Sequence, residues 1–300
     1  MVFISVKCLT FCLLDTIFIT IRKYNTLNNV NGETMFIDSI KQAVQVTYER
    51  EPEGYMSWQH LTFATVLIVL MVVCAILIGK AFKNKSAKAK NNVMIWTAIL
   101  IDTIEIIRVV IACITSDDAM RWLYELPLFL CSIQFITIPL AAFSKGRVKQ
   151  AALDFVFIFG ILSAVMGVYF AGQNFNAYPV LSVHNVANGL THTISGFASL
   201  YIVISGMESM QKKNLPITYG IMLGIGVLAY VANHLLEYNY MFLMRGDGTP
   251  YDILYNLFNG NVVLYPLSVI LLFVLYIYVF NLVYHAIKNK RAKSNSKAQA

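Results

Sequence analysis

Long apolar runs separated by short polar stretches make up most of this chain from residue 58 onward. A transmembrane helix needs about 20 mainly apolar residues, and several runs approach or exceed that length. They cover residues 58–79, 93–114, 126–143, 151–171, 184–206, 216–238 and 262–286. The pattern therefore predicts an all-α fold, a polytopic transmembrane helical bundle of about seven spans.

The composition supports a membrane protein. Of 300 residues, 58% are hydrophobic and 13% are charged, whereas soluble domains carry about 25% charged residues. The formal net charge of +7 could suggest nucleic-acid binding. Because the basic residues lie in short blocks between the apolar runs, we expect no nucleic-acid partner and an integral membrane location.

The basic blocks also predict the orientation. Lysine and arginine concentrate in 80–91, 145–149, 212–213 and 288–297, whereas the alternate loops hold only Arg121 and Arg245. Cytoplasmic loops carry the excess of basic residues. We therefore expect a multi-pass protein of the cell membrane with a cytoplasmic C-terminus.

The chain divides into three parts by pattern. Residues 1–57 form a poorly determined N-terminal extension, in which the short apolar stretch 9–20 could be a weak extra helix. Residues 58–287 form the seven-span membrane domain. Residues 288–300 are polar and basic, and we expect them to be a disordered cytoplasmic tail.

Polar side chains at membrane depth mark sites, pathways or internal pairs, because they are costly there. In the run 184–206 one helical face would carry the polar residues His184, Asn188, Thr191, His192, Ser195 and Ser199. These residues either hydrogen-bond to neighbouring helices or line a site. Two histidines on one face favour a functional role for at least one of them.

Two further polar clusters have both a structural and a functional interpretation. Glu105 and Arg108 are three residues apart and can pair on one helical face, either as a structural ion pair or as support for a site. Asn233 and His234 lie near the outer end of their span with Glu237. They would either line a pocket or satisfy local backbone groups.

Cys131 is the candidate nucleophile. It follows Pro127 in the segment 126–131 (LPLFLC), which we expect to open a helix, because proline is tolerated in the first turn. The predicted orientation places Cys131 in the outer half of the membrane, level with His184, His192 and His234. A thiol and an imidazole at one level can perform nucleophilic acyl transfer. Alternatively, the thiol only packs, or it forms a disulfide with Cys113.

Over about residues 56–290 the chain resembles the transmembrane protein 164-related integral membrane acyltransferases, in particular the bacterial YwaF-like group. The resemblance rests on segment 126–131, the helix from His184 to His192, and the segments 239–243 (NYMFL) and 261–266 (NVVLYP). It implies acyl exchange on phospholipids, with Cys131 as nucleophile and His192 as base. Relatives of this group carry a histidine where this chain has Phe129.

The sequence thus leads to an integral membrane phospholipid acyltransferase with an acyl-cysteine intermediate. Cys131 and His192 would be catalytic, and the pocket residues would be His184, Asn188, Asn233, His234, Glu105 and Arg108. Membrane phospholipids would be the partners, and no metal or soluble cofactor is implied. A lipid hydrolase with the same residues and a small-solute transporter or binding component remain as alternatives.

Overall fold

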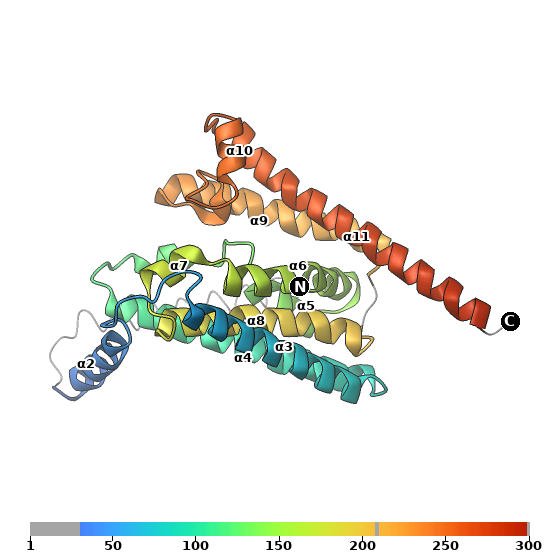
Figure 1. Ribbon diagram of the computed structural model, residues 1–300, viewed down its shortest axis with the longest axis horizontal. Coiled ribbons are helices and arrows are strands. Elements are labelled where there is room, and N and C mark those ends of the chain that lie inside the picture. The colour runs from blue at the N-terminus through green and yellow to red at the C-terminus, as the bar shows by residue number, and fades with distance from the viewer. Residues whose placement is uncertain (1–30, 208–209, 299–300) are drawn as a thin grey trace. The chain divides into compact units, whose positions relative to one another are not determined.

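The computed structural model describes residues 31–207 and 210–298, which form helices joined by turns with no strand among them (Figure 1). The all-α prediction is confirmed. The described residues fall into two units, which divide between Glu51 and Pro52. In the first unit the described helix is α2 (Asn31–Val46). The possible weak helix at 9–20 lies outside the described residues.

The second unit contains the long helices. They are α3 (Trp58–Phe82), α4 (Ala87–Thr115), α6 (Gly146–Tyr169), α8 (Val183–Ile204), α9 (Leu215–Leu236) and α11 (Leu264–Ala298). Short helices lie between them: η1 (Arg121–Glu125), α5 (Gln134–Phe143), α7 (Gly172–Ala177), η2 (Lys212–Asn214), η3 (Tyr240–Phe242) and α10 (Asp252–Leu257). Serine side chains begin α3, α4 and α8, because Ser57, Ser86 and Ser182 each accept a hydrogen bond from a first-turn backbone N–H.

Within the described residues, four helical segments are long and apolar enough to cross a membrane. They are Trp58–Phe82, Gly146–Ala177, Lys212–Leu236 and Leu264–Lys290. The expected number of about seven is not confirmed. Two of the other expected spans lie in α4, which carries charged residues, and in α8, which carries the polar face. The third coincides with α5, which has only 10 residues.

The expected helix opening at Leu126 is wrong, because the helix there begins only at Gln134. Leu126 is extended, with φ −61° and ψ 142°, as the clash with the ring of a following proline favours. The chain then passes through turns, with Leu128 N–H donating to the Leu126 carbonyl at 2.7 Å. Cys131 therefore lies in a turn before the helix and not one turn inside it.

Small residues bring α6 and α8 together, and Figure 1 shows these two helices side by side. A Cβ on Gly160 would overlap the backbone carbonyl of Ser195, and one on Gly167 would overlap the ring of His192. Small residues allow such close backbone approach between membrane helices. The same helix pair is joined by the hydroxyl of Ser199, which donates to the Phe157 carbonyl at 2.8 Å.

The last helix is longer than expected. α11 continues to Ala298, so residues 288–298, expected to be disordered, are helical. A polar end can extend an existing helix because nucleation, the costly step, has already occurred, and the lysines and alanines of this segment are good helix formers. In the apolar part of α11, the Tyr276 hydroxyl donates to the Ile158 carbonyl of α6 at 3.0 Å, which joins the two helices.

Candidate active site

Cys131 is a free, partly buried thiol in the turn between η1 and α5. Burial raises the pKa of Tyr251 to about 12, and Cys131 adds to that rise. Cys113 is also a free thiol, so the structure contains no Cys113–Cys131 disulfide. The thiol of Cys131 is therefore free, in the turn that precedes α5.

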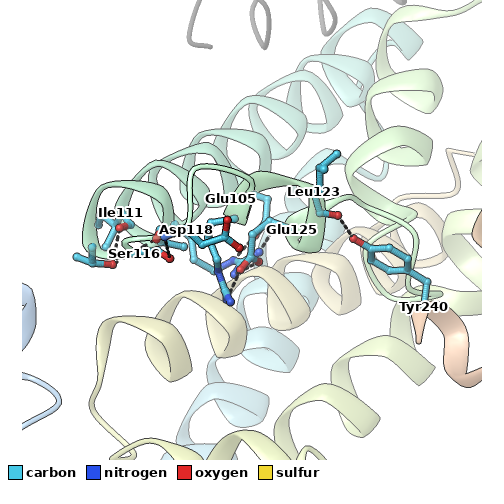
Figure 2. Close-up of polar contacts among 11 residues, drawn as sticks. Glu105, Ile111, Ser116, Asp118, Leu123, Glu125 and Tyr240 are labelled. Atoms are coloured by element: carbon cyan, nitrogen blue, oxygen red, sulfur yellow. Dashed lines mark hydrogen bonds and ion pairs between the residues drawn. The ribbon is translucent and has the colours of Figure 1, made fainter. Parts of the chain in front are cut away.

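A four-membered ion network lies beside this turn. Arg108 binds both carboxylate oxygens of Glu105, at 2.6 and 2.9 Å, as their spacing predicts. The same guanidinium donates to Glu125 at 2.8 Å, and Arg121 donates to the other oxygen of Glu125 at 2.5 Å. Figure 2 shows Glu105 and Glu125 converging in this network. The two positive and two negative charges balance, which lets the carboxylate of Glu125 be almost fully buried.

The sequence did not identify Glu125 as a member of the network. Glu125 lies at the end of η1 and Arg108 within α4, so helical periodicity does not relate them. The available signal was weaker: a charged residue two positions before Pro127, at the edge of an apolar run. Only the turn after α4 brings its carboxylate back to Arg108.

His192 is buried between α8 and α6. Its Nδ1 is 2.9 Å from the hydroxyl of Ser163, and its ring lies against Gly167. Within residues 31–207 and 210–298, no hydrogen bond joins Cys131 to an imidazole. In this structure the hydrogen-bond partner of His192 is therefore Ser163, a residue that the sequence did not single out.

His184 and Asn188 lie one turn apart on α8. The His184 ring packs against Tyr178 with a centroid distance of 4.7 Å, and its neighbour Val183 lines the same cavity as Arg108. The Asn188 amide donates to the Gly167 carbonyl at 3.1 Å. Both side chains are half-buried. His184 thus packs against the segment between α7 and α8, while Asn188 joins α8 to α6.

The remaining polar residues of the α8 face have local partners. Thr191 donates to the Asn188 carbonyl and Ser195 to the Thr191 carbonyl, each at 3.0 Å. Such bonds to the preceding turn satisfy a hydroxyl within its own helix. These hydroxyls are therefore explained without a bound ligand.

The two residues of α9 predicted for the site have different surroundings. Asn233 is buried and is bound through both amide atoms to the backbone of Tyr240, at 3.0 and 2.6 Å. His234 is exposed, and its ring lies edge-on to Tyr230 with centroids 4.6 Å apart. The structure therefore brings Asn233 toward the turn that holds Cys131, and leaves His234 on the outer face of α9.

Aromatic rings connect the Cys131 turn to the segment 239–243. Phe129 packs against Tyr238, Tyr240 and Phe242, with centroid distances of 6.5, 5.4 and 5.8 Å. The Tyr240 hydroxyl also donates to the Leu123 carbonyl, as Figure 2 shows. Two segments far apart in the sequence are thereby held as one surface beside Cys131.

The segment 239–243 has an unusual backbone. Met241 and Phe242 both have positive φ, 55° and 56°, a region that side chains other than glycine seldom adopt. Strained residues persist only where their surroundings hold them, and they cluster at functional sites. Here the Tyr265 hydroxyl donates to the Phe242 carbonyl at 2.6 Å and helps to hold the turn.

His60 is a buried histidine of the described chain, and it lies on α3. His60 on α3 is fully buried, with Nε2 2.8 Å from the Val168 carbonyl and Nδ1 accepting from the Met56 N–H at 3.1 Å. Both ring nitrogens are therefore satisfied by backbone groups. This histidine fixes the start of α3 against the end of α6.

The Glu105–Arg108 pair relates the candidate residues to one another. Arg108 also binds Glu125, which ends η1 just before the turn that holds Cys131. On its other side, Arg108 lines a cavity with Val183 and Ala187 of α8. Across the described part of the chain, no three His, Cys, Asp or Glu side chains gather closely enough to hold a metal ion. The arrangement supplies a thiol, imidazoles and a balanced ion pair, which are groups suited to acyl transfer.

The comparisons with known proteins gave one match. The sequence profile described as the TMEM164 family matches residues 55–286, which include Cys131, His192 and the other candidate site residues. No curated protein and no solved structure matches the chain.

Proposed function

The chain belongs to the TMEM164 family, and from that premise we propose that it is a phospholipid acyltransferase working through an acyl-cysteine at Cys131. It is a helical membrane protein with apolar helices long enough to span a bilayer. One observation carries the proposal. Arg108 of α4 binds Glu125, the last residue of η1 before the turn that holds Cys131, and it lines a cavity together with Val183 and Ala187 of α8, which lie on either side of His184 in the sequence.

In the proposed reaction His192 is the general base. When Nδ1–H donates to Ser163, Nε2 carries a free lone pair and can take the proton of the Cys131 thiol. The thiolate bonds to the ester carbonyl carbon of a phospholipid, and the bond from that carbon to the glycerol oxygen breaks. The leaving oxygen takes the proton from the imidazolium, which leaves a lysophospholipid and a thioester at Cys131.

The second half of the reaction reverses these steps with a different alcohol. The hydroxyl of an acceptor lysophospholipid gives its proton to His192 and attacks the thioester carbonyl. The Cys131 thiolate leaves and recovers the proton. The chemistry requires the sulfur and the imidazole to come within hydrogen-bond reach, directly or through one water, when lipid is bound.

The other residues would support the site from different positions. His184 and Asn188 would line the pocket beside Arg108, and the Glu105–Arg108 pair would hold the polar part of the lipid near the thiol. Asn233 would act by fixing Tyr240 beside the Cys131 turn. His234, which is exposed on α9, would contact a headgroup at the membrane surface.

A labelled lipid distinguishes the candidate activities. The full chain is placed in vesicles that contain a phospholipid with one isotopically labelled acyl chain and an unlabelled lysophospholipid of a different headgroup. Transfer moves the label to the second headgroup, whereas hydrolysis releases it as free fatty acid. Transfer that Cys131→Ala abolishes and Cys74→Ala leaves unchanged supports the proposal. Cys74 is an exposed free thiol on α3 and is the matched control.

The proposed orientation in the cell membrane has its own test. The positive-inside pattern places the C-terminus in the cytoplasm. A reporter enzyme fused after Ala300 and active only in the cytoplasm is expected to be active. The same reporter inserted in the 245–250 loop is expected to be inactive, and the reverse result contradicts the orientation.

A further inference from the structure

An aliphatic groove runs between α4 and α8 beside the ion network. Its volume is about 330 Å³, and its lining is apolar except for Arg108. Ligand pockets begin at about this size. The groove is open along its length to the surroundings of the protein, because the lining residues Ile107 and Leu181 are 53% and 62% exposed. In a membrane, that opening faces lipid.

The two helices run in opposite directions, which gives the groove two different ends. The Tyr201 hydroxyl on α8 donates to the Lys90 carbonyl on α4 at 3.0 Å, and Arg108 of α4 lines the groove together with Val183 of α8. Ile104 and Leu190 therefore lie at one end of the groove. Arg108 lies at the other end, beside Val183. One end is wholly aliphatic and the other has a cation at its edge.

The guanidinium of Arg108 has donors left for a ligand. A guanidinium has five N–H donors. Three of them are used, by two bonds to Glu105 and one to Glu125. One N–H on each terminal nitrogen therefore remains, and the described residues give these two no hydrogen-bond partner. The two carboxylates fix the plane of the guanidinium and hence the direction of these donors.

We propose that this groove binds one acyl chain of a membrane glycerophospholipid, with an ester oxygen accepting from Arg108 and the chain running toward Ile104 and Leu190. An aliphatic trough with donors at one end matches a molecule that is apolar along its length and has oxygen acceptors at one end. The guanidinium fixes the orientation of the chain, because the opposite end offers no polar partner. The inference rests on the proposed function in identifying this lipid as the acyl donor.

The ion network explains how bound lipid would be related to Cys131. Arg108 at the edge of the groove is bonded to Glu125, and Glu125 ends η1 directly before the turn that holds Cys131. An ester held by Arg108 would therefore lie beside the residue that leads into this turn. The groove would bind the chain, and the turn at 126–133 would present the sulfur.

Photocross-linking tests the occupancy and the direction of the chain together. Two phosphatidylethanolamines are used with the full chain in vesicles, one with a diazirine at the end of an acyl chain and one with a diazirine next to the ester. The labelled residues are located by fragmentation of the cross-linked peptides. We expect the chain-end probe to label Ile104 and Leu190. We expect the ester-proximal probe to label Arg108 and Val183.

A pair of matched variants tests whether the label reports the groove. Ile107→Trp fills the groove, whereas Leu100→Trp lies two turns earlier on α4 at nearly the same exposure, 52% against 53%, and does not line it. At low probe concentration labelling is proportional to affinity, so tenfold weaker labelling corresponds to a loss of about 1.4 kcal/mol in binding free energy. We expect that loss for Ile107→Trp, and wild-type labelling for Leu100→Trp.

The outcomes separate this inference from the proposed reaction. The proposal that the groove binds an acyl chain is wrong if the two probes label opposite ends of the groove from those expected. It is also wrong if the groove and the lipid-facing α9 peptide holding Val227 are labelled equally. The Cys131→Ala variant retains the groove, so it must label as the wild type does. If both proteins are labelled as expected but the wild type transfers no acyl chain, the groove still binds lipid and the acyltransferase proposal is wrong.

Discussion

The side chain of Asn233 binds both backbone polar groups of Tyr240. Its Nδ2 donates to the Tyr240 carbonyl at 3.0 Å, and its Oδ1 accepts from the Tyr240 N–H at 2.6 Å. Both residues are buried, and Tyr240 in turn reaches Leu123 and Phe129. The end of α9 is therefore connected through one amide to the turn that holds Cys131.

Loss of this amide should lower stability. Asn233→Ala leaves the N–H and the carbonyl of Tyr240 without their partners, and an unsatisfied buried polar group costs about 1–3 kcal/mol. We expect the free energy of unfolding to fall by that amount, measured by thermal unfolding in detergent. Asn256→Ala on the exposed face of α10 is the control. Equal unfolding temperatures for the two variants would contradict the role of Asn233.

The contact between Gly167 and His192 predicts a steric effect. A methyl group at Gly167 would overlap the imidazole, and overpacking of this kind typically costs about 1–3 kcal/mol. Gly167→Ala should therefore be destabilising and should weaken any activity that depends on the position of His192. The matched variant is Gly220→Ala on α9, where a methyl group meets nothing within 4 Å.

Gly220→Ala should instead raise the free energy of unfolding, because alanine is favoured over glycine in a helix by about 0.5–1 kcal/mol. Unfolding of both variants under the same detergent conditions checks the pair. If Gly167→Ala is as stable as Gly220→Ala, the imidazole does not occupy the position described here.

The ion network predicts that its two arginines contribute unequally to stability. Arg108→Met leaves the buried carboxylates of Glu105 and Glu125 without their shared partner, and breaking a buried ion pair costs about 3–5 kcal/mol. Arg121→Met removes a residue that is 38% exposed, and such pairs are worth about 0–1 kcal/mol. Thermal unfolding should therefore show a much larger loss for Arg108→Met. Equal losses would mean that Glu125 is not held by Arg108.

The helical class and one element of the site could be predicted from the sequence. Apolar runs identify helices, since the bilayer sets their length, and the spacing of three residues predicts the pairing of Glu105 with Arg108. The start of the helix near Cys131 could not be predicted. An apolar run such as 126–133 has the same composition in a turn as in a helix, and only the packing of Phe129 against segment 238–242 distinguishes the two.

Residues far apart in the sequence account for the rest of the difference. Glu125 joins Arg108 only because the chain turns back after α4. His234 and Asn233 are adjacent in sequence, yet one is exposed and the other buried, because neighbouring positions on a helix point about 100° apart. Composition and periodicity identify the polar residues of a span, but their partners depend on how the helices pack.

The most direct test of the account is a thioester at Cys131. The purified protein is incubated with a phospholipid carrying an isotopically labelled acyl chain, digested at low pH, and analysed by mass spectrometry. Cys113→Ser is the matched control, because Cys113 is also a partly buried free thiol beside the ion network. We predict the labelled acyl mass on the peptide holding Cys131 in the wild type and in Cys113→Ser, and its loss on treatment with hydroxylamine. No acyl mass on Cys131 in the wild type, with lipid turnover unchanged in Cys131→Ala, would contradict the account.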